Sequence, residues 1–160
     1  MRHLAIGDGA LTIEKKGYSV LTPDQQSWRE SNIMKIPNTN LTQGLGVNER
    51  LGGRLWRLPA YSANTWHKHV DSWEFYFLLE GKGRIRIGDD TIEVPQYGSV
   101  VVAPHMLRQV FNDTADEVLW LIIGAPQEGQ SGYKPTYEDA YPEDPRSLPA
   151  ELAGHSWPPS

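Results

Sequence analysis

The sequence predicts an all-β protein whose strands form a sandwich, a barrel or a jelly roll. Short apolar runs crowd residues 50–125, and glycine, proline and aspartate separate them. Runs such as FYFLL, SVVVA and VLWLII are rich in aromatic and β-branched residues and are too short for typical helices. Many short strands with frequent turn signals are typical of these β architectures.

Seven strands are expected in this central stretch, one for each apolar run. They cover residues 54–58, 74–79, 84–87, 91–94, 99–103, 109–111 and 118–123. Gly88, Asp89 and Asp90 separate the third strand from the fourth and predict a tight hairpin turn. Gly81 is expected to turn the chain from the second strand into the third.

A chain of 160 residues has room for one domain with its own core. We expect edge strands and loops over residues 1–49, the barrel core over residues 50–125, and an extended Pro-rich tail over residues 126–160. The tail contains seven prolines and no periodic apolar pattern, so we expect it to lie on the barrel or on a neighbouring subunit. Disorder is the alternative for a segment of this composition.

The composition argues against several classes of function. Because the chain has no cysteine, disulfides, thiolate zinc sites and cysteine nucleophiles are excluded. The formal charge of −5 and the scattered basic residues disfavour nucleic acid as a partner. No apolar run approaches the roughly 20 residues that span a bilayer, and the N-terminus lacks the pattern of a secretory signal. A cytoplasmic protein with a small-molecule partner is therefore the expectation.

Residues 66–74, with the sequence WHKHVDSWE, carry the strongest chemical pattern. In a strand, His67 and His69 point to the same face, and a short turn returns Glu74 on the adjoining strand. Two imidazoles and one carboxylate suit Fe(II), and also accept Mn, Ni, Co or Zn, while they leave positions open for substrate or water. We therefore expect a divalent transition metal here. Histidines that serve only the surface or the core are the alternative.

The parity of the following strand adds one further candidate. Glu74, Tyr76 and Leu78 alternate with the other residues of the run, so they share one face. If Glu74 faces the interior, Tyr76 does as well. Tyr76 is therefore the candidate catalytic residue, as a proton donor in the pocket.

Residues 67–81, HKHVDSWEFYFLLEG, resemble the first sequence signature of the cupin superfamily. The second signature is met in part: Gly98 and Pro104 match its opening, and Met106 stands where the family has a second glycine. Aligned without gaps, Gln109 stands at the position of the fourth ligand, a histidine, and Asp113 at that of an asparagine. The resemblance covers roughly residues 50–125, and it implies a double-stranded β-helix, that is, a jelly-roll barrel.

The resemblance makes Gln109 the candidate fourth metal ligand beside His67, His69 and Glu74. Its amide oxygen coordinates the metal in one interpretation. In a second, it contacts a substrate or a bound water, and in a third the site has lost its metal. Gln109 and Phe111 share a face, and Phe111 is expected inside, so Gln109 is expected to point inward. His105 follows Pro104 in a loop, where a position at the rim, facing solvent, is expected.

Arginine residues supply candidates for holding an anionic group, because a guanidinium binds carboxylate or phosphate with two parallel hydrogen bonds. Arg54, Arg57 and Arg108 are three of them. Arg84 and Arg86 alternate with isoleucines, so we expect these two on a solvated outer face.

The resemblance implies a metal-dependent enzyme that acts on a small organic substrate, and the open three-ligand face favours dioxygenase-like oxygen chemistry. A metal-dependent isomerase, lyase or decarboxylase is an alternative, and so is a non-catalytic barrel that binds or senses a small molecule. The metal is expected to be Fe, Mn, Ni or Zn. Because the edges of a jelly roll must be paired or covered, we also expect a homodimer.

Overall fold

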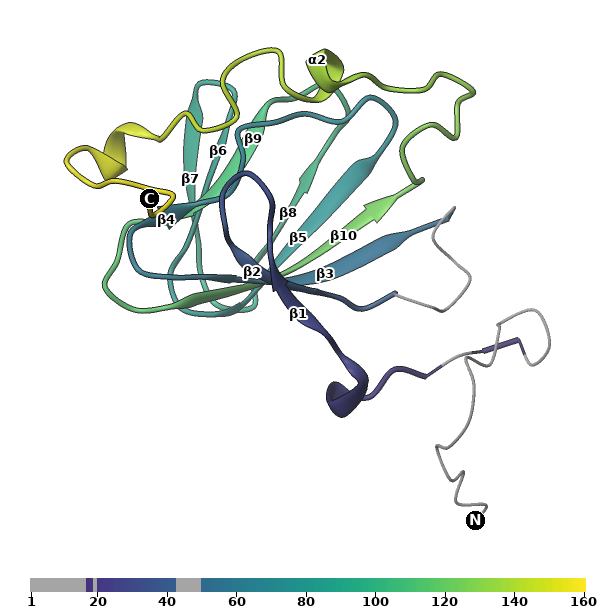
Figure 1. Ribbon diagram of the computed structural model, residues 1–160, viewed down its shortest axis with the longest axis horizontal. Helices are drawn as coiled ribbons and strands as arrows, with labels where there is room; N and C mark the ends of the chain where they lie inside the picture. Colours follow the sequence, from purple (N-terminus) through teal and green to yellow (C-terminus); the bar gives the residue numbers. More distant parts are fainter. Residues whose placement is uncertain (1–16, 19, 43–49) are drawn as a thin grey trace.

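Two antiparallel sheets enclose one core, to which strands of both contribute (Figure 1). The structure, a computed structural model, describes residues 17–18, 20–42 and 50–160. Part of the predicted N-terminal segment, namely residues 1–16, 19 and 43–49, lies outside the described residues.

The larger sheet has six strands in the order β1-β2-β3-β10-β5-β8. These strands are β1 (Trp28–Glu30), β2 (Pro37–Asn40), β3 (Gly52–Leu58), β5 (Trp73–Glu80), β8 (Ser99–Val102) and β10 (Val118–Ala125), with the 3-10 turn η1 (Pro23–Gln25) before β1. The smaller sheet has the order β4-β9-β6-β7 and consists of β4 (Ser62–Ala63), β6 (Gly83–Ile87), β7 (Asp90–Val94) and β9 (Arg108–Asn112). This arrangement is the jelly-roll barrel that the sequence predicts.

All seven predicted central strands are present as β3 and β5 to β10, and their bounds differ from the expected ones by at most two residues. The turns also lie where they are expected. Gly81, between β5 and β6, has φ +88, and a Cβ there would lie 2.9 Å from the carbonyl oxygen of Glu117. Gly88, between β6 and β7, has φ +56. Glycine adopts both conformations at lower energetic cost than residues with a side chain do.

Alternation along the strands places one side chain in two in the core between the sheets. Tyr76 and Leu78 of β5 are buried there together with Trp120 of β10, and Ile85 and Val110 contribute from the smaller sheet. The rings of Tyr76 and Trp120 meet edge to face, with centroids 6.3 Å apart. Glu74 shares this inward parity, so β5 carries its carboxylate into the barrel, as the sequence predicts.

The C-terminal tail (residues 126–160) lies on the barrel of its own chain (Figure 1). It contains the short helix α2 (Tyr137–Ala140) and the 3-10 turn η2 (Ala150–Leu152). Trp157 Nε1 donates to the carbonyl oxygen of Met34 at 2.6 Å, and Leu152 packs into the core with 1% of its surface exposed. Among the described residues, no helix has the length and apolar character that crossing a membrane requires.

The tail covers the outer face of β6 and β9, where Arg84 and Arg86 lie side by side. Arg86 Nη2 donates to the carbonyl oxygen of Ser147 at 2.8 Å, and its guanidinium lies 4.0 Å from the ring centre of Trp66. The alternation of Arg84 and Arg86 with isoleucines is as predicted. The expectation that their face is solvated is wrong, because residues far along the chain cover it.

The opposite side of the molecule presents apolar side chains on β5 and on the edge strand β8. Trp73, Phe75 and Val101 are 54%, 36% and 60% exposed, and Phe75 pairs with Val101 across the two strands. The homodimer expected from the sequence stays a prediction.

The substitution Leu152→Ala tests whether packing of the tail contributes to the stability of the core. We expect Leu152→Ala to lower the free energy of unfolding by about 2–5 kcal/mol, because the truncation removes buried methyl groups and leaves a cavity in the core. Met106→Ala is the control, since that side chain is 45% exposed. Urea denaturation measures both variants. A loss below about 0.5 kcal/mol for Leu152→Ala, which is typical of surface substitutions, would mean that the tail is not part of the core.

Candidate metal centre

The two histidines of the motif lie on a segment that runs antiparallel to β9. Ala63 pairs with Phe111, and the chain then continues along β9 until His67 forms an isolated bridge with Arg108. In this bridge Arg108 N donates to the His67 carbonyl oxygen at 2.8 Å. His69 follows two residues later, and its ring lies edge-on to that of His67 with centroids 5.0 Å apart. The predicted pairing of the two imidazoles is therefore present.

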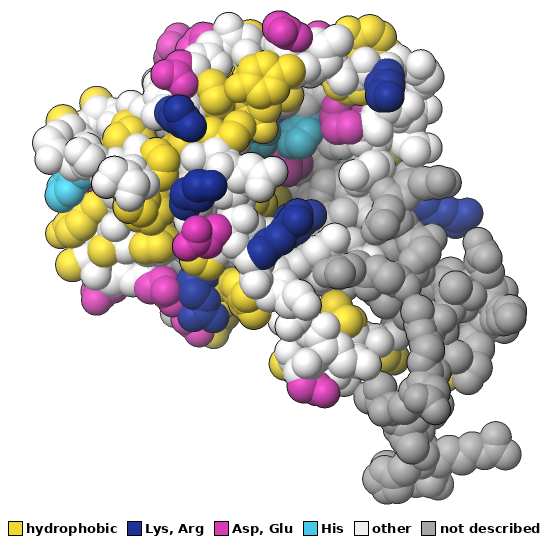
Figure 2. Space-filling view, viewed as in Figure 1, with side chains coloured by type: hydrophobic (Ala, Val, Ile, Leu, Met, Phe, Trp, Pro, Cys, Tyr) yellow, Lys and Arg dark blue, Asp and Glu magenta, His cyan; other side chains and the backbone are white. Residues whose placement is uncertain are grey.

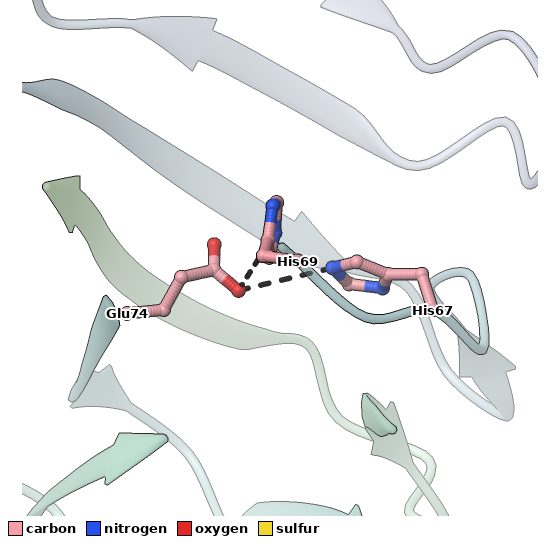
Figure 3. A group of neighbouring side chains, drawn as sticks. All are labelled: His67, His69 and Glu74. Atoms are coloured by element: carbon pink, nitrogen blue, oxygen red, sulfur yellow. Dashed lines mark ion pairs between the residues drawn. The ribbon is translucent and has the colours of Figure 1, made fainter. Parts of the chain in front are cut away.

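Glu74 approaches both imidazoles from the neighbouring strand β5 (Figure 3). Its Oε1 atom lies 3.1 Å from Nε2 of His69 and 3.8 Å from Nε2 of His67. One ligand atom from each of the three residues lies within 4.8 Å of the other two. The sequence predicts this group of three, and the fold brings its members together from two sheets.

The far side of each imidazole faces an oxygen atom. His67 Nδ1 lies 3.0 Å from the carbonyl oxygen of Thr65, and His69 Nδ1 lies 3.4 Å from Oε1 of Glu128. These contacts favour the tautomer in which Nδ1 carries the proton, so that Nε2 presents its lone pair to the cluster. Oxygen acceptors of this kind commonly orient the histidine ligands of metals.

The donor set fits a divalent transition metal. Ligand atoms about 2.1 Å from one ion lie about 3–3.5 Å apart in tetrahedral or octahedral geometry, close to the 3.1 and 3.8 Å separations of the Glu74 oxygen from the two imidazole nitrogens. Nε2 of His69 is buried and has no hydrogen-bond partner in the structure. Buried polar atoms normally have a partner, and a bound cation would supply it.

Tyr76 fixes the orientation of the Glu74 carboxylate. Its hydroxyl donates to Glu74 Oε1 at 2.6 Å. Burial and the neighbouring carboxylate raise the pKa of Tyr76 well above its ordinary value, so the hydroxyl keeps its proton. Burial alone would raise the pKa of Glu74, but in the metal-free site hydrogen bonds and positive charge from protonated His67 and His69 outweigh it and hold this pKa well below its ordinary value. The role of Tyr76 as a proton donor to substrate stays a prediction, whereas its contact positions Glu74.

A cavity of about 310 Å³ opens beside the three residues. Figure 2 shows histidine and acidic side chains together in a hollow of this face. Arg54 and Trp56 of β3, Tyr76 of β5 and Tyr141 of the tail contribute to its walls. Arg54 Nη1 donates to Oδ1 of Asn38 at 3.0 Å, which restrains its guanidinium. The site thus combines metal-ligating groups with a cation and aromatic rings.

Gln109, the predicted fourth ligand, points away from this cavity. Its Oε1 accepts from Arg86 Nε at 2.7 Å, and its Nε2 donates to the carbonyl oxygens of Asn64 and Ser147 at 2.6 and 2.9 Å. Both ends of the amide are therefore engaged beneath the tail. The inward orientation expected for Gln109 is wrong, because both faces of β9 are buried and the burial of Phe111 does not identify the interior face.

Arg108 is the β9 residue that approaches the cluster. It is fully buried, and its Nη1 lies 3.8 Å from Oε1 of Glu74. If the chain is aligned with the second signature with one gap of one residue, Arg108 takes the ligand position and Asn112 the position of the asparagine. That alignment would have indicated that Arg108 is the β9 residue nearest the cluster. Asn112 is buried, and its Nδ2 donates to three carbonyl oxygens, among them that of Asp116 at 2.7 Å.

The remaining candidates lie outside the cluster. His105 is exposed at the rim, as expected, and its backbone N donates to the carbonyl oxygen of His69 at 2.7 Å. Arg57 forms an ion pair with Glu117 at 2.7 Å, with both side chains more than 40% exposed. Among the arginines expected to bind an anion, Arg54 is therefore the one that lines the cavity.

Glu128 joins the tail to the loop of residues 70–72 between the candidate ligands His69 and Glu74, a role that no pattern in the sequence indicated. Its carboxylate accepts from the backbone N of Val70, Asp71 and Ser72 at 3.1, 3.0 and 2.8 Å. Asp71 Oδ2 returns the contact by accepting from the backbone N of Gly129 at 2.9 Å. An acidic residue in a Pro-rich segment gave no signal of this role, since the partner loop lies almost sixty residues earlier.

Comparison with known families finds a match in the central part of the chain. A family model described as "Cupin domain" matches residues 54–124, the stretch from β3 to β10 that includes His67, His69 and Glu74. No curated protein matches the sequence at a significant level.

Solved structures share the fold at low sequence identity. A sugar phosphate isomerase of the cupin superfamily from Silicibacter pomeroyi has a TM-score of 0.60 and 17% identity, over 66% of this chain and 74% of that chain. A predicted oxalate decarboxylase from Thermotoga maritima has a TM-score of 0.59 and 15% identity, over 67% and 98%. A cupin-2 domain from Rhodospirillum rubrum has a TM-score of 0.57 and 16% identity, over 76% and 82%.

The substitution Gln109→Ala tests whether the side-chain amide of Gln109 has a structural role or ligates the metal. Because the amide is engaged by Arg86, Asn64 and Ser147, the variant should keep the metal affinity of the wild type. It should lose about 1–3 kcal/mol of stability, the cost of leaving buried polar groups without partners. Metal titration and urea denaturation measure the two effects. A clear loss of metal affinity at unchanged stability would restore Gln109 as a ligand.

Because of the Glu128 carboxylate, we expect the free energy of unfolding to depend on pH. Burial raises the pKa of Glu128, but the three backbone N–H donors outweigh it and hold the pKa below its ordinary value. The ionised carboxylate therefore stabilises the folded state above the unfolded pKa of about 4.3, and this contribution is lost as the pH falls through the lower folded pKa.

For metal-free protein, we expect Glu128→Gln to be less stable than wild type from pH 5 to 7 and the difference to narrow on acidification. Denaturant melts from pH 7 down to the lowest pH at which the protein folds measure this difference. Glu80→Gln, at an exposed position, is the control. A stability difference that stays constant down to the lowest pH at which the protein folds would contradict the assignment.

Proposed function

Because residues 54–124 match the family model of a cupin domain, we propose that this protein is a metal-dependent enzyme that acts on a small organic anion. The observation that carries the proposal is the convergence of His67, His69 and Glu74 beside a cavity of about 310 Å³. A cavity of this volume suits a small metabolite.

The three residues would hold Fe, Mn, Ni or Zn in a 2-His-1-carboxylate arrangement. A bound ion of this class acts as a Lewis acid and leaves positions open for a substrate atom, oxygen or water. The protein contributes the orientation of the ligands. Thr65 and Glu128 set the two imidazoles, and Tyr76 sets the carboxylate.

Arg54 supports an anionic substrate. Arg54 lines the same cavity as the three candidate ligands, and a guanidinium can bind a carboxylate or a phosphate with two parallel hydrogen bonds. Trp56 and Tyr141 line the cavity as well and offer ring faces to an organic skeleton. A substrate would thus contact the metal through one end and Arg54 through another.

Oxygen chemistry of the dioxygenase type is the reaction class that we favour, because three protein ligands leave room for both substrate and oxygen. A decarboxylase, lyase or isomerase reaction is the second candidate. It is supported by Arg54 in the cavity wall and by two neighbours in fold, a sugar phosphate isomerase and a predicted oxalate decarboxylase.

Metal binding and turnover test the proposal together. Metal-free protein is titrated with Fe(II), Mn(II), Ni(II) and Zn(II), and each loaded form is incubated with small mono- and dicarboxylates while oxygen consumption and carbon dioxide release are followed. We expect about one metal per chain, and His67→Ala with His69→Ala should weaken binding by more than the roughly 10–100-fold typical of changes around a metal site.

His155→Ala serves as the matched control, because this histidine is exposed and stacks on Tyr61 away from the cluster. Oxygen consumption would support the dioxygenase class, and carbon dioxide release without oxygen uptake would support the second candidate. Full metal occupancy in the double variant would refute the site. Metal and ligand binding without any turnover would favour a barrel that senses a small molecule.

A further inference from the structure

Arg108 brings a buried positive charge to the edge of the metal centre. It pairs with His67 across the backbone bridge, so the side chains of the two residues start close together. Its side chain has no exposed surface, and its Nη1 lies 3.8 Å from Oε1 of Glu74. A shorter ligating side chain at this position would therefore lie beside the imidazole of His67.

The guanidinium of Arg108 is only partly satisfied. Nη2 donates to the carbonyl oxygen of Ala103 at 2.8 Å, whereas Nε and Nη1 are buried without a hydrogen-bond partner in the structure. Buried donors without acceptors destabilise the folded state, and they do so more strongly when the group is charged. The Glu74 carboxylate offsets part of this charge, but it also accepts from Tyr76 and faces both imidazoles.

The charges around the cluster indicate what completes it. A divalent ion, Arg108 and Glu74 together carry two net positive charges when the histidines are neutral. The Glu128 carboxylate beside His69 lowers this to one. A cation close to a metal ion is compensated when an anion occupies the open coordination position.

We propose that Arg108 takes the place of a fourth protein ligand, so that the metal centre is completed by an anionic oxygen ligand, a carboxylate, from solution. This inference rests on the proposed function and names the class of group that binds next to the metal. Arg108 excludes a fourth protein donor from β9, and its charge favours an anion over water at the position left open.

A purely structural role for Arg108, as the counter-ion of Glu74, makes a different prediction. In that case a carboxylate in solution has no effect on metal affinity. If the carboxylate shares the centre with the metal, each must raise the affinity of the protein for the other by the same factor. Linkage between acetate and metal is therefore the discriminating measurement.

The experiment titrates the metal-free full-length chain with Co(II) or Mn(II) in acetate and in chloride at equal ionic strength. For wild type we expect acetate to raise metal affinity by about 5-fold or more. Arg108→His supplies an imidazole and removes the charge, so it should bind metal about 10-fold more tightly in chloride and lose most of the acetate effect. Arg108→Lys keeps the charge and should keep the acetate effect.

Gln109→His is the matched control, because it adds an imidazole one residue away on the opposite face of β9 and should leave both affinities as in wild type. If Arg108→His does not fold, as judged by its melting curve, wild type and Arg108→Lys still decide through the acetate effect. Metal binding without any acetate effect in wild type overturns this inference alone. Absence of metal binding in wild type overturns the proposed function as well.

Discussion

The antiparallel pairing of the His67 segment with β9 is the constraint on which the candidate metal centre depends. It aligns His67 with Arg108 through backbone hydrogen bonds, and β5 then delivers Glu74 to the same point from the other sheet. His67, Arg108 and Glu74 lie on elements whose positions are set by strand pairing. Rigid strands fix a ligand geometry better than loops do, because their backbone is already ordered by the sheet.

The tail has a larger part in this architecture than its composition suggests. It supplies Glu128 to the loop that carries the histidines, and Ser147 to the network of Arg86 and Gln109. It also contributes Leu152 to the core. The tail therefore stabilises the outer face of the smaller sheet and orients His69, one of the candidate metal ligands, which couples the stability of the fold to the site.

Local patterns in the sequence predicted most of the barrel. Strands such as β5 and β10 could be recognised because a preference for strand structure is visible within a few consecutive residues, as a run of aromatic and β-branched side chains. The group of His67, His69 and Glu74 was found for the same reason. Its members are two and five residues apart, and a strand followed by a short turn brings residues at this spacing close together. The turn at Gly81 likewise follows from a backbone conformation that glycine adopts most easily.

The sequence by itself therefore determined the strand order along the chain, the inward parity of β5 and the identity of the three candidate ligands. Only the tertiary structure decided which face of β9 meets the metal centre. All five residues of β9 are buried, so hydrophobicity could not distinguish the barrel interior from the face beneath the tail. The orientation of β9 placed Arg108 beside Glu74 and Gln109 under the tail. The sequence pattern could not reveal this orientation, because it depends on contacts between segments that lie about forty residues apart in the chain.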